Sequence, residues 1–167
     1  LREDLKELGD RENIDFNLKK ILHLATFAPS GHNTQPWYFT INGNVITILP
    51  DYRRSLPIVD PDDHALFISL GCALENLVIA AKHYGYKPDI NYVLGREKSE
   101  KIEVALKKDD HLKDNGLFAA IPVRQATRKK YDGKPIPEND LQELQKSSRQ
   151  EDVIVKIFTD EHEREPL

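Results

Sequence analysis

The spacing of apolar residues along the chain predicts helices that alternate with strands. Leu18, Ile21, Leu22 and Ala25 recur at helical spacing and are followed by "APSG", so we expect a helix over residues 15–27. The next segments, "WYFTI" and "VITIL", are rich in aromatic and β-branched residues. Because "NGN" joins them, the sequence predicts a β-hairpin at this point.

A long helix is expected over residues 61–84. Asp60 is a favourable N-cap, and Pro61 suits the first helical position. Leucine and alanine residues then line one broad face, and Gly85 is placed to end the helix. A helix of this length with one apolar face usually packs against a sheet or a partner subunit.

The remainder of the chain continues the alternation. "INYVLG" and "KIEVALKK" predict two further strands, and "LFAAIP" predicts a short apolar turn. "PIPENDLQELQKSS" predicts a helix, and "DVIVKIF", residues 152–158, predicts a last strand. This order is typical of a layered domain of helices and a sheet rather than a bundle or a sandwich.

Composition narrows the classes of function. The 167 residues carry a formal charge of −4 and a pI near 5.9, which argues against a nucleic-acid partner because phosphate neutralisation needs a basic face. Glu75 and Asn76 interrupt the longest apolar run, so we expect no membrane-spanning helix. The single cysteine, Cys72, excludes an internal disulfide and is expected to be a buried structural thiol in a cytoplasmic protein.

The sequence carries neither a metal motif nor the features of natural chain ends. Six histidines and one cysteine form no His-Glu-x-x-His motif or cysteine pair, and no Rossmann or P-loop glycine motif is present. The chain begins with Leu1 and contains no Met. We therefore expect a fragment of a longer protein, in which an export signal could precede Leu1.

Two helical segments match at an offset of 123 residues. Leu18 aligns with Leu141 and Ile21 with Leu144 (141 − 18 and 144 − 21), and each segment is followed by a turn and an aromatic or β-branched stretch. We interpret this as two related units, residues 1–123 and the start of an incomplete second unit at residues 124–167. Two amphipathic helices can also share a pair of leucines by chance, so this repeat is a hypothesis.

Three segments resemble one known family. "APSGHNTQPWYF" resembles the Pro-Ser-x-x-Asn-x-Gln-Pro-Trp loop of the nitroreductase-like FMN-dependent family, and "RQATRKKYDGKPIPENDLQEL" is similar to its arginine motif. "DPDDHALFISLGCALENLVIAAKHYGY" is similar to its long interface helix, in the form of the Acg-like branch. The resemblance implies an α+β, three-layer α/β/α fold, in which helices flank a mostly antiparallel central sheet. It also implies FMN as cofactor, NAD(P)H as hydride donor and a nitroaromatic or quinone-like acceptor.

The resemblance implies a flavin site built from two distant segments. Arg124 and Arg128 would bind the phosphate of FMN, and Thr127 would supply the hydroxyl that Ala126 lacks at the family's Ser position. The loop would contribute residues that face the flavin or hold the loop itself: Pro29, Ser30, Asn33 and Gln35. Pro36 and Trp37 are expected to be structural, and His32 is given no role. No catalytic acid or base is required, because in this family the flavin does the chemistry.

The same residues have ordinary interpretations as well. The arginine segment could be a solvated basic loop, and the Ser30 segment could be a helix-ending loop with internal turns. A flavin-binding or flavin-storage protein with little turnover is an alternative to a reductase, and so is an interaction domain without flavin.

In this family the flavin lies between two units, which implies a homodimer or a pairing with a second nitroreductase-like half. Leu1 and Leu5 stand where the first unit would carry the counterparts of Arg124 and Arg128, and the second unit lacks the Pro-Ser-x-x-Asn loop. We therefore hypothesise that each unit supplies half of one flavin site.

Overall fold

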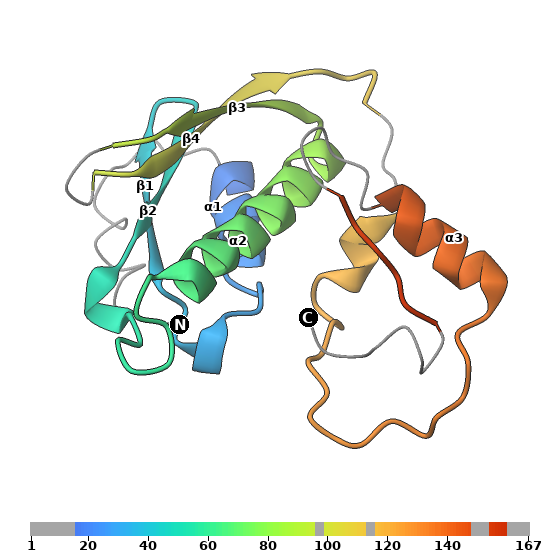
Figure 1. Ribbon diagram of the computed structural model, residues 1–167. Coiled ribbons are helices and arrows are strands. Elements are labelled where there is room, and N and C mark those ends of the chain that lie inside the picture. The colour runs from blue at the N-terminus through green and yellow to red at the C-terminus, as the bar shows by residue number, and fades with distance from the viewer. Residues whose placement is uncertain (1–15, 96–98, 113–115, 148–153, 160–167) are drawn as a thin grey trace. The chain divides into compact units, whose positions relative to one another are not determined.

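The computed structural model describes residues 16–95, 99–112, 116–147 and 154–159, and the chain divides into two units, Leu1–Ala126 and Thr127–Leu167. The elements of the first unit are α1 (Phe16–Ala25), β1 (Trp37–Asn42), β2 (Val45–Pro50), α2 (His64–His83), β3 (Tyr86–Val93) and β4 (Lys101–Lys108). Short 3-10 helices lie between them: η2 (Gly31–Asn33), η3 (Tyr52–Arg54) and η4 (Leu117–Ala120). The second unit contains α3 (Glu138–Ser147) (Figure 1).

The four strands form one antiparallel sheet in the order β1-β2-β4-β3. Because side chains alternate between the two faces of a strand, Ile46, Ile48 and Val104 share one face, and all three are fully buried. The opposite face is polar and carries ion pairs, among them Lys101 with Glu103 at 2.7 Å. The pattern therefore separates a core face from a hydrated face, and it confirms the predicted hairpin and the expected antiparallel sheet.

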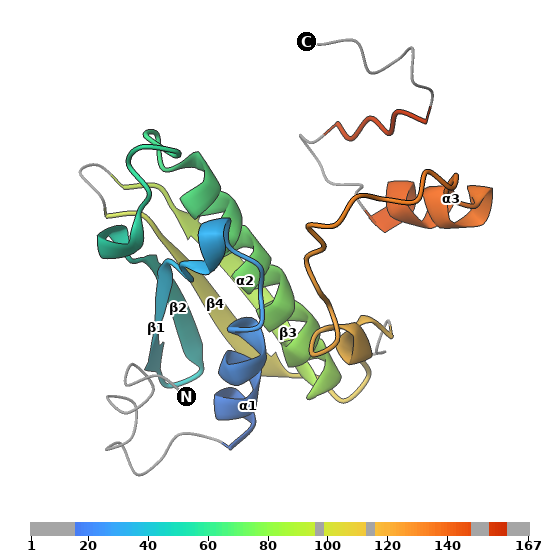
Figure 2. The same cartoon turned by 90° about the horizontal axis from the view of Figure 1, so that it is seen from below.

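Helices cover the core face of the sheet. The long helix α2 packs against β2 and β3, and α1 lies alongside α2 on the same side of the sheet (Figure 2). The core joins these layers through fully buried side chains: Ile21, Leu22, Ile46, Ile48, Leu77 and Val104. The α+β architecture is confirmed. Within the described residues of the first unit, α1 and α2 form one layer on the core face of the sheet.

By length and composition alone, α2 could cross a membrane, and among the described residues no other helix passes that test. Within the fold, 56% of its most apolar window is buried. Burial of this kind is what a core helix requires, since it removes apolar surface from water.

The start of α2 differs from the expectation, although Asp60 has the predicted capping role. The helix begins at His64 rather than Pro61, because Asp63 has a left-handed backbone with φ of 55° that interrupts the helical path. The Asp60 carboxylate nevertheless accepts hydrogen bonds from the backbone N–H groups of Ala65 (2.9 Å) and Leu66 (3.0 Å). Asp60 therefore satisfies amide groups in the first turn from a position outside the helix.

The predicted end of α2 is confirmed. Gly85 follows the helix with φ of 74°, and its N–H donates to the carbonyl of Lys82 at 3.0 Å. A left-handed residue at this position is typical of a helix C-terminus and is least costly for glycine.

We expect Gly85→Ala to lower the free energy of unfolding by about 1–2 kcal/mol, because an alanine at this φ places its Cβ against the following carbonyl. Gly71→Ala is the matched control, since Gly71 lies inside α2 and an added Cβ would meet no atom within 4 Å. That change should stabilise the protein by up to about 1 kcal/mol. Urea unfolding of both variants tests the pair, and equal effects of the same sign would contradict this reasoning.

The second unit contains the predicted helix but not the predicted strand. Residues 138–147 form α3, whereas residues 154–158 of the predicted strand have no regular secondary structure, and residues 152–153 lie outside the described part. A strand needs a hydrogen-bonded neighbour, and the described residues of this unit contain no strand to pair with it. Leu1 and Leu5, which enter the repeat hypothesis, also lie outside the described residues, and the repeat stays a hypothesis.

Candidate functional site

The loop between α1 and β1 is closed by its own hydrogen bonds. The backbone N–H of Gln35 donates to the hydroxyl oxygen of Ser30 at 2.9 Å, and the Gln35 side chain donates to the carbonyl of Thr26 at 3.4 Å. Inside this closure, Asn33 and Thr34 donate their N–H groups to the carbonyls of Ser30 and Gly31. Ser30 and Gln35 therefore both stabilise the loop conformation. For Gln35, the two predicted roles were to hold the loop and to face the flavin.

Three non-glycine residues of this loop have left-handed backbones. The φ angles are 49° at His32, 56° at Asn33 and 49° at Gln35. Each such conformation costs on the order of 1–3 kcal/mol and persists only where the surroundings enforce it. Such strain gathers at functional sites, so its presence here supports a functional role for the loop.

Two of the left-handed residues have exposed side chains. Asn33 and His32 are both exposed, and their side chains make no hydrogen bond to any described residue. Pro29 and Ser30 beside them are half-buried. The exposed amide of Asn33 can both donate and accept hydrogen bonds. Asn33 can therefore bind a polar group of a ligand without breaking a hydrogen bond to a described residue.

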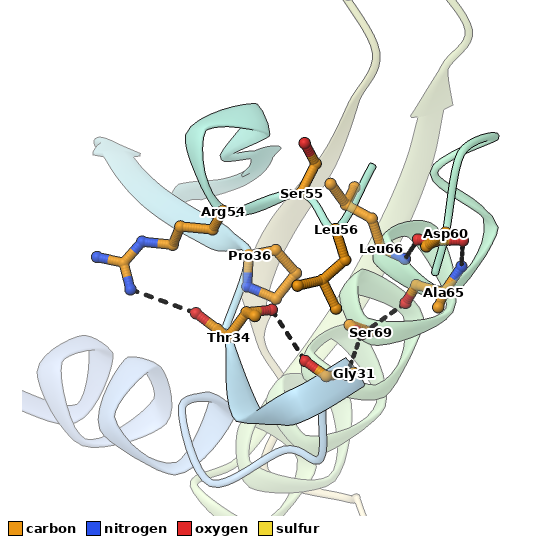
Figure 3. Close-up of a pocket in the computed structure, with 10 residues that line it drawn as sticks. All are labelled: Gly31, Thr34, Pro36, Arg54, Ser55, Leu56, Asp60, Ala65, Leu66 and Ser69. Atoms are coloured by element: carbon orange, nitrogen blue, oxygen red, sulfur yellow. Dashed lines mark hydrogen bonds between the residues drawn. The ribbon is translucent and has the colours of Figure 1, made fainter. Parts of the chain in front are cut away.

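Helix α2 holds the loop through Ser69, a residue that sequence analysis missed. The N–H of Gly31 donates to the Ser69 hydroxyl oxygen at 3.3 Å, and that hydroxyl donates to the carbonyl of Ala65 at 2.6 Å (Figure 3). Ser69 is 2% exposed. A lone serine on the apolar face of a helix was the signal in the sequence, because a buried hydroxyl needs partners.

The turn after β2 holds the other side of the loop. The N–H of Asp51 donates to the carbonyl of Pro36 at 3.0 Å, and Nη1 of Arg54 donates to the carbonyl of Thr34 at 3.3 Å. The buried Asp51 carboxylate accepts hydrogen bonds from Nε of Arg53 (2.8 Å) and Nε of Arg54 (3.0 Å). Hydrogen bonds from Arg53 first, and from Arg54, lower the pKa of Asp51 against the opposing effect of burial.

Tyr52 ties this turn to the start of β4. Its hydroxyl donates to Oε2 of Glu100 at 2.9 Å. Burial, with a smaller effect of the Glu100 carboxylate, raises the pKa of Tyr52 to about 12. The phenol therefore stays protonated and keeps donating throughout the neutral range.

A small cavity lies among these contacts. Its lining includes Gly31, Thr34, Arg54 and Ser69 (Figure 3), and its volume is about 10 Å³. That is the space of a single water molecule, so this cavity cannot hold a flavin ring. Asn33 in the same loop is exposed, so its amide is accessible to a larger ligand.

The structure brings the first predicted arginine to this loop. Nη2 of Arg124 donates to the carbonyl of Phe27 at 3.1 Å, across 97 residues of sequence. Arg124 is exposed, and a guanidinium has five N–H donors, so donors are left for a ligand. Cys72 is half-buried against the core rather than fully buried as expected. Burial raises the pKa of its thiol, and Arg124 partly opposes this effect.

The other two predicted residues of the arginine segment lie in the second unit. Thr127 and Arg128 are both exposed there. Their part in a shared site stays a prediction.

No protein-family model matches this chain. Two Mycobacterium tuberculosis proteins, from strains CDC 1551 / Oshkosh and ATCC 25618 / H37Rv, are each 30% identical over 127 residues, which cover 74% of this chain and 37% of each relative. Both are named "Putative NAD(P)H nitroreductase". The chain thus spans just over a third of the length of these curated relatives.

Among solved structures, a nitroreductase family protein from Streptococcus pneumoniae TIGR4 is similar with a TM-score of 0.45 and 14% sequence identity. The alignment covers 78% of this chain and 90% of that protein.

Proposed function

Because the chain belongs to the nitroreductase-like family, we propose that it forms part of an FMN-binding oxidoreductase that uses NAD(P)H. The observation that carries the proposal is the contact between Arg124 and the carbonyl of Phe27, which joins the two flavin-related segments within one unit. The family resemblance predicts that these two segments lie together, and the contact is a separate observation that supports this prediction.

The residues of the loop fit the edge of a flavin. The Asn33 amide is exposed and presents both donors and an acceptor, as the pyrimidine edge of a flavin requires. The Ser30 hydroxyl uses its oxygen for the N–H of Gln35 and keeps its own proton to donate. Arg124 offers a permanent positive charge and planar donors for a phosphate, and we propose that Arg128 and Thr127 add to it.

When bound, FMN would accept a hydride from NAD(P)H and pass electrons to an acceptor, for which we propose a nitroaromatic or quinone-like compound. The chain's own residues bind and orient the cofactor, and none of them has to act as an acid or a base. The loop contributes orientation, because its hydrogen bonds hold the backbone that carries Asn33.

We further propose that a second nitroreductase-like unit, in a homodimer or in the same longer chain, completes the site. Four exposed apolar side chains close in sequence to the start of α2 support a partner there: Ile58, Val59, Phe67 and Ile68, which are 95%, 63%, 40% and 57% exposed. The curated relatives are more than twice as long as the matched segment, so they have room for a second unit. Membership of the Acg-like branch and a cytoplasmic location stay predictions.

Titration of the purified protein with FMN, followed by visible absorbance, tests the proposal. We expect bound flavin with a perturbed spectrum, bleached by NADPH or NADH under anaerobic conditions. Asn33→Ala and Arg124→Ala should each weaken FMN binding about tenfold, while Lys107→Ala on the hydrated sheet face should leave it unchanged. Failure to take up FMN both in this chain and in a longer chain that includes a second unit contradicts the proposal, and bound flavin that neither nucleotide bleaches favours a storage role.

A further inference from the structure

We propose that Arg54 is a positioning residue that, oriented by the buried carboxylate of Asp51, holds residues 30–36 in the conformation that binds the cofactor. This inference rests on the proposed function and deepens it. Arg54 reaches the loop through the carbonyl of Thr34, at 3.3 Å from Nη1. The same side chain binds Asp51 through Nε at 3.0 Å.

The turn holds the loop on both sides of a strained residue. Gln35 has φ of 49°, and the carbonyls of its two neighbours, Thr34 and Pro36, accept hydrogen bonds from Arg54 and from the N–H of Asp51. The N–H of Gln35 itself donates to the Ser30 hydroxyl. Three hydrogen bonds therefore fix the backbone around Gln35, and the costly conformation is over-determined, as its persistence requires.

The Asp51–Arg54 pair is suited to positioning because it is partly removed from water. The side chain of Asp51 is 6% exposed and that of Arg54 is 31% exposed. A fork of guanidinium donors that binds a carboxylate on one side and a carbonyl on the other has little freedom to rotate. Arg54 therefore holds the loop in a fixed position relative to the turn.

The neighbouring arginine provides a matched control within the same turn. Arg53 also binds the Asp51 carboxylate, through Nε at 2.8 Å and Nη2 at 3.0 Å, but its side chain is 84% exposed. Loss of either arginine removes one positive charge and one partner of Asp51. Arg54 contacts the carbonyl of Thr34 in addition, so the comparison of the two variants tests the importance of that contact.

The first measurement is FMN affinity. We expect Arg54→Gln to weaken binding about tenfold or more and Arg53→Gln to change it less than about threefold. Arg54→Lys keeps the charge but cannot bind Asp51 and Thr34 through one rigid fork, so it should not restore affinity. Full restoration by lysine would mean that Arg54 acts only as a charge, and equal effects of Arg53→Gln and Arg54→Gln would overturn the proposal.

A double-mutant cycle identifies how Arg54 acts. If Arg54 works by orienting Asn33, the combination of Arg54→Gln with Asn33→Ala should weaken FMN binding little more than the stronger single change. Fully additive effects would mean that Arg54 contributes independently of Asn33. That result would overturn the positioning role.

The last measurement needs no flavin, so it separates this inference from the proposed function. Amide hydrogen exchange of residues 30–36 should be faster in Arg54→Gln than in wild type or Arg53→Gln, while exchange in β2 and β4 is unchanged. Unchanged exchange in the loop overturns the inference even if wild type binds FMN. Faster exchange in a protein that binds no FMN leaves Arg54 as the residue that fixes the loop and rejects the flavin function alone.

Discussion

Leu77→Ala is expected to lower the free energy of unfolding by about 2–5 kcal/mol. Leu77 is fully buried on α2, in the core that joins this helix to α1 and the sheet. Truncation removes three buried carbon atoms and leaves a cavity that close-packed neighbours fill only in part. Urea denaturation followed by far-ultraviolet circular dichroism measures the change, and the midpoint should fall with little change in slope.

Ile68→Ala on the same helix is the control for this experiment. Ile68 is 57% exposed. In the absence of a partner, its truncation should change the free energy of unfolding by no more than about 0.5 kcal/mol. Comparable losses for both variants would show that the core does not lie where the structure places it.

Asp60→Ala is expected to cost about 1–3 kcal/mol. Asp60 is 8% exposed, and its carboxylate is the hydrogen-bond acceptor for the N–H groups of both Ala65 and Leu66. Alanine leaves these two donors without that acceptor at the start of α2, where water has little access. Thermal and urea unfolding measure the loss, and Asp60→Asn should lose less because the amide keeps one acceptor oxygen.

Asp62→Ala tests whether charge alone explains the effect. Asp62 is exposed and lies close to the same end of the helix, so its removal should cost no more than about 1 kcal/mol through the helix dipole. If Asp62→Ala and Asp60→Ala were equally destabilising, the two hydrogen bonds of Asp60 would not be the cause.

The elements of the first unit could be predicted from local pattern because each depends on residues close in sequence. Apolar spacing is sufficient for α1 and α2, and "NGN" between two β-branched segments is sufficient for the hairpin. The start of α2 was misplaced by three residues, since Asp63 has a left-handed backbone, which capping residues and apolar spacing do not reveal. The last strand was wrong in its described part, because strand formation depends on a neighbour that local pattern does not specify.

The candidate site was predicted in part. Ser30, Asn33 and Arg124 were identified by resemblance, and the structure places all three on or beside one loop. Ser69 and Arg54 were not identified, although they hold that loop from α2 and from the turn after β2. Their roles depend on backbone carbonyl and N–H groups, which every residue has, so no motif marks them.

The chemistry of single residues and the type of most elements follow from the chain's own order, because propensity, periodicity and capping act over a few residues. The fold adds the contacts between distant segments. Arg124 reaches the carbonyl of Phe27 across 97 residues, and Arg54 reaches Thr34 across 20, only once the helices have packed on the sheet. Burial of the shared core brings these groups together, and that burial is a property of the assembled unit rather than of any one segment.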